Sequence, residues 1–219
     1  MNNKQEIDCL LGLLALRPDV YGKLLTFYHD SSQLDDTELA INAMVLAAGC
    51  GDQITLNSAF AAGAKPNEWG TAKVGPAFYL ELYSPLRRTI DGHHTKCLEL
   101  LLQNGADANE YLLVNNQTTI DIMSHSPIML ACSRNYVDGV KLLVHYGAKI
   151  EGKALLDTTP LMYAAMNGGE DCVRFLIAEG ADLDAVNLEG QTAEAIAIQE
   201  NELVCAAILR AAKEQKSKE

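Results

Sequence analysis

The 219-residue sequence lacks any apolar run of the roughly 18 or more residues that a membrane-spanning helix needs. Basic residues are also scarce, since 17 lysines and arginines stand against 29 aspartates and glutamates, for a formal net charge of −12. Nucleic-acid binding depends on clustered Lys and Arg side chains. We therefore expect neither a membrane span nor a nucleic-acid partner.

The signatures of the common enzyme classes are missing as well. No G-x-S-x-G, H-E-x-x-H or G-x-x-x-x-G-K-[ST] motif occurs. The histidines are scattered over unrelated positions, and no pattern pairs the carboxylates across a cleft. The sequence therefore predicts a non-enzymatic protein with no catalytic residues and no cofactor. An enzymatic or small-molecule role for the two insertions described below is the least supported alternative.

The segment Thr158–Gly169, TTPLMYAAMNGG, contains the signals of a complete short helix. Pro160 suits the first turn of a helix, because its missing N–H has no intrahelical partner there, and the threonines before it can cap the helix. Ala164 and Ala165 let another helix approach closely. Gly168-Gly169 then ends the helix, since glycine adopts left-handed conformations at little cost.

A second helix, expected from Asp171 to Ala178, completes a pair that recurs along the chain. Helix starts of the same kind occur 33 residues earlier, at Ser126-Pro127, and 33 residues later, at Thr192-Ala193. The glycines that close the second helices form a series: Gly63, Gly105, Gly147 and Gly180. The last spacing in this series is 33 residues and the two before it are 42. One such pair cannot bury its apolar face alone, so the period predicts a solenoid of stacked units.

These motifs resemble those of the ankyrin-repeat family. TPLMYAA at 159–165 is similar to the ankyrin signature T-P-L-H-x-A, and EGADLDA at 179–185 is similar to the end of the second helix and the turn that follows it. SPIMLAC at 126–132 and AMVLAAGCGD at 43–52 are more divergent copies.

The resemblance implies an all-α repeat solenoid, in which helix-turn-helix units stack and hairpin fingers project from them. A non-standard helical cap is expected over residues 1–36, with helical patterns from Gln5 to Leu16 and from Pro18 to Tyr28. Five repeats are expected at about 37–69, 70–111, 112–153, 154–186 and 187–212, followed by a charged tail at 213–219.

Two repeats contain nine extra residues each, since their glycine spacing is 42 rather than 33. Gly75-Pro76-Ala77 is a half match to the helix start, which places the first excess between Ser84 and His94, as a loop between two helices. The second excess, about Leu112 to Ile120, lengthens the hairpin that joins two repeats. Long loops are usually functional or disordered, and we favour a function.

The six cysteines contain no C-x-x-C pair and no cluster with metal-ligand spacing. Cys97, Cys172 and Cys205 occupy the same position of the second helix in three repeats. Successive repeats stack about 8–10 Å apart, too far for a disulfide between regular neighbours. We therefore expect no metal, and cysteines that pack as small apolar residues in a reducing cytosol.

Hairpin fingers and the adjoining helix faces form the surface on which such a stack binds a partner. Six residues after each closing glycine, the finger position holds Trp69, Tyr111, Lys153 and Val186. Aromatic side chains dominate binding hot spots. The alternative is that Trp69 folds back onto its own repeat.

Aliphatic residues precede the helix starts, where the family is usually polar. Ile122-Met123, Leu155-Leu156 and Leu188-Glu189 occupy these positions, and an exposed apolar stripe usually marks a contact site. Alternatively, the inserted LLVNNQTTI covers Ile122 and Met123. We expect Met166, Arg134 and Tyr83 to line the helical face beside the fingers. The predicted partner-binding residues are therefore Trp69, Tyr83, Tyr111, Ile122, Met123, Arg134, Leu155, Leu156 and Met166.

We therefore expect a monomeric cytoplasmic module that binds another protein. Between Glu151 and Glu202 the chain has eleven acidic and two basic residues, which indicates either a solvated face or steering of a basic partner segment. The apolar run from Cys9 to Leu16 follows two acidic residues and precedes Arg17-Pro18-Asp19, which is not the pattern of a secretion signal.

An alternative is an adaptor, or a bacterial effector acting in the host cytosol, that recruits an enzyme such as a ubiquitin ligase through its N-terminal helices. LRPDVYGKLLTFY at 16–28 faintly resembles the opening of an F-box, although Arg17 interrupts the leucine-proline step.

Overall fold

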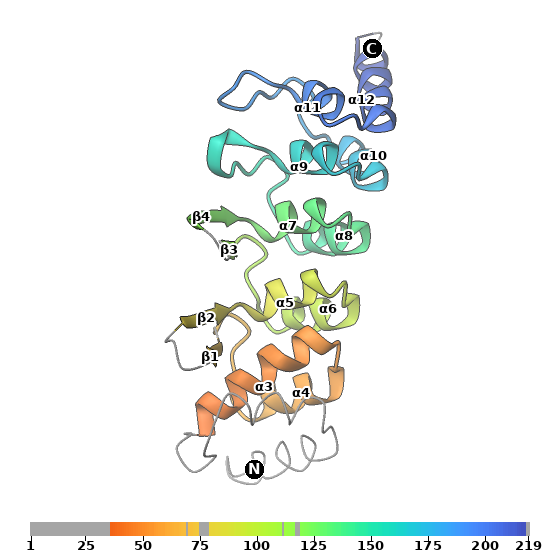
Figure 1. Cartoon of the computed structure of the whole chain (residues 1–219). Helices are drawn as coiled ribbons and strands as arrows, with labels where there is room; N and C mark the ends of the chain where they lie inside the picture. The colour runs from red at the N-terminus through yellow and green to blue at the C-terminus, as the bar shows by residue number, and fades with distance from the viewer. Residues whose placement is uncertain (1–35, 69, 75–78, 111, 117–118, 218–219) are drawn as a thin grey trace. The chain divides into compact units, whose positions relative to one another are not determined.

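The computed structural model describes residues 36–68, 70–74, 79–110, 112–116 and 119–217, and Figure 1 draws the rest as a grey trace. Contacts within the chain divide it into two compact units, residues 1–107 and 108–219. The predicted cap helices between Gln5 and Tyr28 lie outside the described residues. No helix in the described part of the chain combines the length and the apolar composition needed to cross a membrane.

The described part of the first unit contains two helix pairs with a β-hairpin between them. Its elements are α3 (Asp36–Cys50), α4 (Gln53–Ala61), β1 (Gly70–Val74), β2 (Tyr79–Tyr83), α5 (Pro85–Asp91) and α6 (Thr95–Gln103). The strands β1 and β2 are antiparallel, with Gly70 opposite Tyr83 and Val74 opposite Tyr79. α3 packs against α4 and α5, and α4 packs against α6, so each helix pair buries the apolar face of the other.

The second unit contains three helix pairs. Its elements are β3 (Leu112–Asn116), β4 (Thr119–His125), α7 (Pro127–Ser133), α8 (Val137–His145), η2 (Leu155–Asp157), α9 (Pro160–Met166), α10 (Glu170–Ala178), α11 (Ala193–Gln199) and α12 (Leu203–Lys216). α9 packs against both α7 and α11, and α10 packs against both α8 and α12. In Figure 1 these first and second helices form two rows, and the fingers project beyond the first row. Both units are stacks of helix pairs, so the predicted repeat fold is confirmed.

The predicted helix starts are also confirmed. Thr159 precedes α9 with extended backbone angles (φ −89°, ψ 164°), and its hydroxyl oxygen accepts a hydrogen bond from the backbone N–H of Met162 at 3.3 Å. Thr192 caps α11 in the same way. The cap satisfies one of the N–H groups that have no partner within a helix. Ala164 and Ala165, at the centre of α9, are fully buried where the neighbouring first helices approach.

The closing glycines share a left-handed backbone conformation. Gly63, Gly105, Gly147 and Gly180 have φ values of 104°, 93°, 86° and 89°. No atom lies within 4 Å of a Cβ built at any of these four positions. The turn therefore selects glycine for its backbone freedom and not for lack of space.

An asparagine four residues after a closing glycine joins one finger to the next. The Asn67 side chain donates to the Gly105 carbonyl at 3.1 Å and accepts from the Asp107 N–H at 2.9 Å. Asn109 repeats both bonds in the second unit, to Gly147 at 3.0 Å and Lys149 at 2.9 Å. We call these bonds the finger ladder.

The finger ladder changes chemistry towards the C-terminus. Glu151 occupies the next position, and its carboxylate accepts from the Asp182 N–H at 2.9 Å. A carboxylate has no N–H to donate, so the second bond of the amide cannot form there. Asp184 occupies the last position and pairs with Lys213 of α12 at 2.9 Å. The ladder had not been predicted, although its glycine-plus-four position is visible in the sequence.

The predicted place of the first insertion is wrong. Pro85–Asp91 forms helix α5, with the Ser84 hydroxyl accepting from the Arg87 N–H at 3.4 Å as its N-terminal cap. Ser84-Pro85 is therefore the helix start, and the extra residues belong to the β1–β2 hairpin. Gly75-Pro76-Ala77 lies outside the described residues, between the two strands.

The second insertion was placed correctly, in a hairpin. β3 and β4 pair antiparallel from Leu112 opposite His125 to Asn116 opposite Thr119, with an irregularity between Val114 and Asn116. In both insertions, strand pairing satisfies backbone groups that an irregular loop would leave to solvent. The residue limits of the five predicted repeats stay a prediction.

We expect Asn109→Asp to destabilise the second unit by about 1 kcal/mol, the typical net contribution of one hydrogen bond. The substitution keeps the acceptor for the Lys149 N–H but removes the donor to the Gly147 carbonyl. Urea unfolding followed by circular dichroism measures the change. Asn201→Asp is the matched control, because Asn201 is exposed and its substitution adds the same negative charge away from the ladder. Equal unfolding midpoints for the two variants would contradict the role of the ladder.

Candidate partner-binding surface

The nine predicted partner-binding residues fall into three groups. Trp69 and Tyr111 lie outside the described residues. Tyr83 belongs to the first unit and lies in strand β2, so its expected place on a helical face is wrong; the helix start is at Ser84-Pro85 rather than at Gly75-Pro76. The other six belong to the second unit: Ile122, Met123, Arg134, Leu155, Leu156 and Met166. A single edge formed by all nine residues stays a prediction.

The six predicted binding residues of the second unit lie in two finger elements, β4 and η2, and at the ends of two helices, α7 and α9. Ile122 and Met123 lie in β4, where Met123 is opposite Val114 of β3. Leu155 and Leu156 begin the short helix η2. Met166 is the last residue of α9 and is 38% exposed, and Arg134, which follows α7, is exposed.

Two neighbouring fingers present aliphatic side chains to solvent. We call residues 147–159 the Leu156 finger and residues 180–192 the Leu188 finger. Leu156 is 46% exposed and Leu188 is 70% exposed. The Leu188 N–H donates to the Leu156 carbonyl at 2.9 Å, so the two fingers are in direct contact at these residues. Val186, at the predicted finger position, is 47% exposed. We call the exposed aliphatic residues of these two bonded fingers, Leu156, Val186 and Leu188, the apolar patch.

The Leu156 finger holds its leucine in a strained conformation. Leu156 has φ 63° and ψ 23°, and the next residue, Asp157, has φ 57°. Left-handed angles cost an ordinary residue about 1–2 kcal/mol. Two hydrogen bonds close the turn, from Asp157 N–H to the Ala154 carbonyl at 3.1 Å and from Ala154 N–H to the Thr158 carbonyl at 3.0 Å. Lys153 also pairs with Asp157 at 3.2 Å.

Asn187 fixes the loop that carries Leu188. Its side-chain oxygen accepts from the N–H groups of Glu189 at 3.0 Å and Gln191 at 2.9 Å. Its backbone N–H donates to the Gln191 carbonyl at 3.1 Å, and its carbonyl accepts from the Gly190 N–H at 3.0 Å. An asparagine that bonds to the backbone ahead of it is a common way to close a tight turn. Leu188 therefore projects from a closed loop.

A ring contact at the base of the fingers had not been predicted. The His125 ring, at the end of β4, lies 4.9 Å from the Tyr163 ring of α9, with an interplanar angle of 56°. His125 is 8% exposed, and burial raises the pKa of Tyr163. Tyr163 directly follows Met162, which occupies the position where the ankyrin signature has histidine. The ring contact joins the β3–β4 hairpin to the following repeat.

The Leu188 finger is acidic. It contains Asp182, Asp184 and Glu189 and no basic residue. A hydrogen bond from Lys213 and the charge of that ammonium hold the pKa of the Asp184 carboxyl below its ordinary value. Glu189 is exposed, next to the most exposed leucine of the patch.

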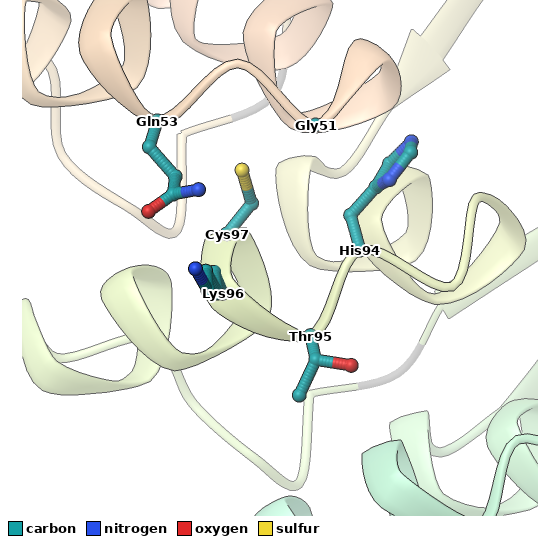
Figure 2. A pocket seen from close by; sticks show the side chains of 6 residues that line it. All are labelled: Gly51, Gln53, His94, Thr95, Lys96 and Cys97. Carbon is teal, nitrogen blue, oxygen red and sulfur yellow. The ribbon is translucent and has the colours of Figure 1, made fainter.

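The first unit contains a cavity of about 220 Å³, lined by Gly51, Gln53, His94, Thr95, Lys96 and Cys97. Figure 2 shows the Cys97 thiol directed towards the segment that carries Gly51 and Gln53. Burial, together with the negative charge of Asp52, raises the pKa of Cys97 to about 11. The thiol is therefore neutral near pH 7 and is not activated as a nucleophile. His94 Nε2 lies 3.2 Å from the Gly49 carbonyl oxygen, which orients the ring.

The predicted packing of the cysteines is confirmed, with one addition. Cys97, Cys172 and Cys205 are at most 1% exposed and are free thiols. Cys132 of α7 is also buried, beside Cys172 of the next repeat, and burial raises the pKa of Cys132 well above its ordinary value. The search for pairs in equivalent positions of successive repeats missed this contact, because it joins a first helix to a second helix. Within the described ranges, no group of three His, Cys, Asp or Glu side chains could hold a metal ion.

We expect thiol reagents to modify Cys50 before the four buried cysteines. Cys50 is partly exposed, whereas burial raises the pKa values of Cys97, Cys132 and Cys205 and so lowers their thiolate fractions at pH 8. The pKa of Cys172 is lowered, but its thiol is fully buried and out of reach of the reagent. Timed reaction with N-ethylmaleimide, followed by peptide mass spectrometry, measures each rate. Urea should make all rates similar. Equal native rates at Cys50 and Cys132 would contradict this packing.

The model of the family described as "Ankyrin repeats (3 copies)" matches residues 23–154 and 128–218. Human ankyrin repeat and SOCS box protein 11 is 30% identical over 131 residues, which cover 60% of this chain and 38% of that protein. The Drosophila melanogaster transient receptor potential cation channel subfamily A member 1 is 32% identical over 113 residues, covering 48% of this chain and 8% of the channel. Human protein phosphatase 1 regulatory subunit 27 is 49% identical over 51 residues, covering 23% of this chain and 33% of that protein. The chain therefore spans less than two fifths of the length of these relatives.

Proposed function

Because this chain belongs to the ankyrin repeat family, we propose that it is a non-enzymatic module that binds a partner protein through its fingers and the adjoining first helices. Protein–protein interaction is the general role of the family. The proposal for this chain places the contact at the apolar patch of Leu156, Val186 and Leu188. Met166 and Arg134 supply the neighbouring helical contacts.

The observation that carries the proposal is the exposure of aliphatic side chains on two bonded fingers. Leu156 and Leu188 are 46% and 70% exposed, and the hydrogen bond between their backbones fixes their separation. Burying apolar surface contributes about 25 cal/mol per Å², so a partner gains free energy by covering both side chains. Because the fingers are already ordered, little conformational entropy is lost on binding.

The backbone of Leu156 supports the same conclusion. Glycine or asparagine would adopt its left-handed angles at lower cost than leucine. A leucine that is both strained and exposed contributes little to the core, so packing does not account for it. Strained residues of this kind cluster at ligand contacts and active sites. A binding contact accounts for the leucine side chain at this position.

The chemistry of the described cysteines supports a non-enzymatic role. Burial raises the pKa values of Cys97, Cys132 and Cys205, and Cys172, whose pKa is lowered by its interaction with Cys132, is fully buried. His125 lies against the Tyr163 ring, and His94 against a backbone carbonyl. On the Leu188 finger the exposed side chains are aliphatic and acidic, which favours binding over catalysis.

A second candidate function is an adaptor that brings an enzyme to the bound partner. It is favoured by the name of one relative, which is a regulatory subunit of protein phosphatase 1. The N-terminal segment, residues 1–36, is the candidate for the second contact. Co-purification of an enzyme with the full chain, and its loss on deletion of residues 1–36 with partner capture retained, would support this function.

We expect the double variant Leu156→Ser/Leu188→Ser to lose partner capture and to remain folded. Removal of a hot-spot side chain costs about 2 kcal/mol of binding or more, roughly 30-fold in affinity. Affinity capture from lysate with quantitative mass spectrometry compares the variant with wild type, and thermal melts verify the fold. The melting temperature should not fall, because both leucine side chains are exposed and replacing them with serine removes no packing contact from the core.

The matched control is Ile54→Ser/Leu203→Ser. Ile54 and Leu203 are 67% and 62% exposed, and each lies in the first turn of a second helix, away from the fingers. This control should capture the same proteins as wild type. If both double variants lose the same proteins, binding follows total exposed apolar surface and the proposed site is wrong. If neither loses any, the fingers are not the contact.

A further inference from the structure

The finger surface of the second unit combines an apolar patch with unneutralised carboxylates. The three aliphatic side chains of the patch lie within or next to an acidic sequence, since Asp157 follows Leu156, and Glu189 follows Leu188. Together the Leu156 and Leu188 fingers contain five carboxylates and two lysines. The charge beside the patch is therefore negative, and the chemistry of the partner depends on how much of it is already paired.

Two of the five carboxylates have a lysine partner. Lys153 pairs with Asp157 at 3.2 Å, and Lys213 pairs with Asp184 at 2.9 Å. The carboxylate of Glu151 accepts from the Asp182 N–H, and that of Asp182 accepts from the Asp184 N–H. Backbone N–H groups orient these two carboxylates without cancelling their full negative charge. The backbone N–H of Glu189 donates to Asn187 and so helps to close the loop. The Glu189 residue itself is exposed to solvent.

The remaining lysine of the two fingers lies on the side of the preceding finger. Lys149 donates its backbone N–H to Asn109, and together with Asn109, Ser126 and Lys153 it lines a cavity of about 100 Å³. The Leu188 finger lies on the opposite side of the Leu156 finger and has no basic residue of its own. Glu151, Asp182 and Glu189 therefore keep a net negative field beside the apolar patch.

We propose that the partner contacts this surface through a protein segment that carries an aliphatic or aromatic side chain flanked by Lys or Arg. This inference rests on the proposed function and names its partner. The apolar side chain covers Leu156 and Leu188, and the flanking cations lie near Glu189 and Asp182. Charges at a surface attract over about 8 Å at physiological salt, and Glu189 directly follows Leu188 in the chain. Such complementarity raises the association rate and excludes acidic segments.

Two other occupants fit the charge less well. A second copy of this chain would bring the same acidic fingers, and like charges facing each other cost binding energy. Residues 1–35 contain five acidic and three basic residues, so that segment is also acidic. Charge complementarity therefore favours a separate, basic partner.

The test begins with an unbiased selection. A phage library of random 12-residue peptides is selected on the full chain, and the enriched peptides are synthesised with a fluorescent label. The expected consensus is one or two apolar residues flanked by Lys or Arg. Fluorescence anisotropy then gives the affinity of the best peptide for each variant at 50 mM and 500 mM NaCl.

The decisive comparison is Glu189→Lys against Asp171→Lys. We expect Glu189→Lys to weaken the peptide about tenfold at 50 mM NaCl and less than about twofold at 500 mM, since salt screens exposed charges. Asp171 is exposed in the first turn of α10, about 13 Å of helix from the Leu188 finger. Lys96 occupies the equivalent position of α6, so the repeat accepts lysine there. Asp171→Lys should leave the affinity within about twofold, because the same charge change lies beyond the screening distance.

Other outcomes separate this inference from the proposed function. Peptides that are lost with Leu188→Ser but are neutral or acidic, or insensitive to Glu189→Lys, would overturn the basic partner and leave the finger site standing. If no enriched peptide loses affinity with Leu188→Ser, both the basic partner and the proposed finger site are wrong. Dimerisation of the full chain in analytical ultracentrifugation, abolished by Leu188→Ser, would assign the surface to a second copy and overturn the basic partner.

Discussion

Packing between neighbouring helix pairs is the constraint on which the rest of this structure depends. α7, α9 and α11 have seven residues each, well below the about 12–15 residues that an isolated helix needs in water. Each of these helices persists because its apolar face is buried against the next pair. Ala164 and Ala165 are fully buried at such a contact, where a side chain that ends at Cβ lets the helices approach. Stability is therefore shared between neighbouring repeats, and little of it comes from the fingers.

Because the helix stack supplies most of the stability, the fingers can expose apolar side chains while the protein stays folded. The finger ladder, the Asn187 loop and the turn at Leu156 hold the finger backbone by hydrogen bonds. Because these bonds are made by backbone and amide groups, the exposed leucines are not needed for folding. The surface is set by local turns, and its rigidity comes from the stack beneath it.

The fold could be predicted from the sequence because its signals are local. Thr159-Pro160 caps and starts a helix, and Gly180 closes the next, wherever they occur in a chain. The first insertion was misplaced for a related reason: Gly75-Pro76 and Ser84-Pro85 both look like helix starts, and strand pairing between β1 and β2 decides between them. That pairing joins residues up to 13 positions apart and has no clear local signal.

The candidate site was harder to predict. The sequence indicated Leu155 and Leu156 as finger residues and placed Leu188 in the apolar stripe, yet left it out of the predicted binding set. Its exposure depends on the loop closed by Asn187, and its contact with Leu156 joins two repeats. The contact between Cys132 and Cys172 was missed because it links different helices of successive repeats. Such neighbours follow from the stacking geometry and not from spacing along the chain.

Hydrogen–deuterium exchange on the second unit, with and without a captured partner, tests the central claim most directly. The backbone amides of Ala154, Asp157 and residues 187–191 already bond within or between the two fingers, so covering them should slow their exchange further. The account predicts new protection in these two segments and in the last turn of α9, with α12 unchanged. Protection confined to α12, or to segments outside the fingers, would contradict it.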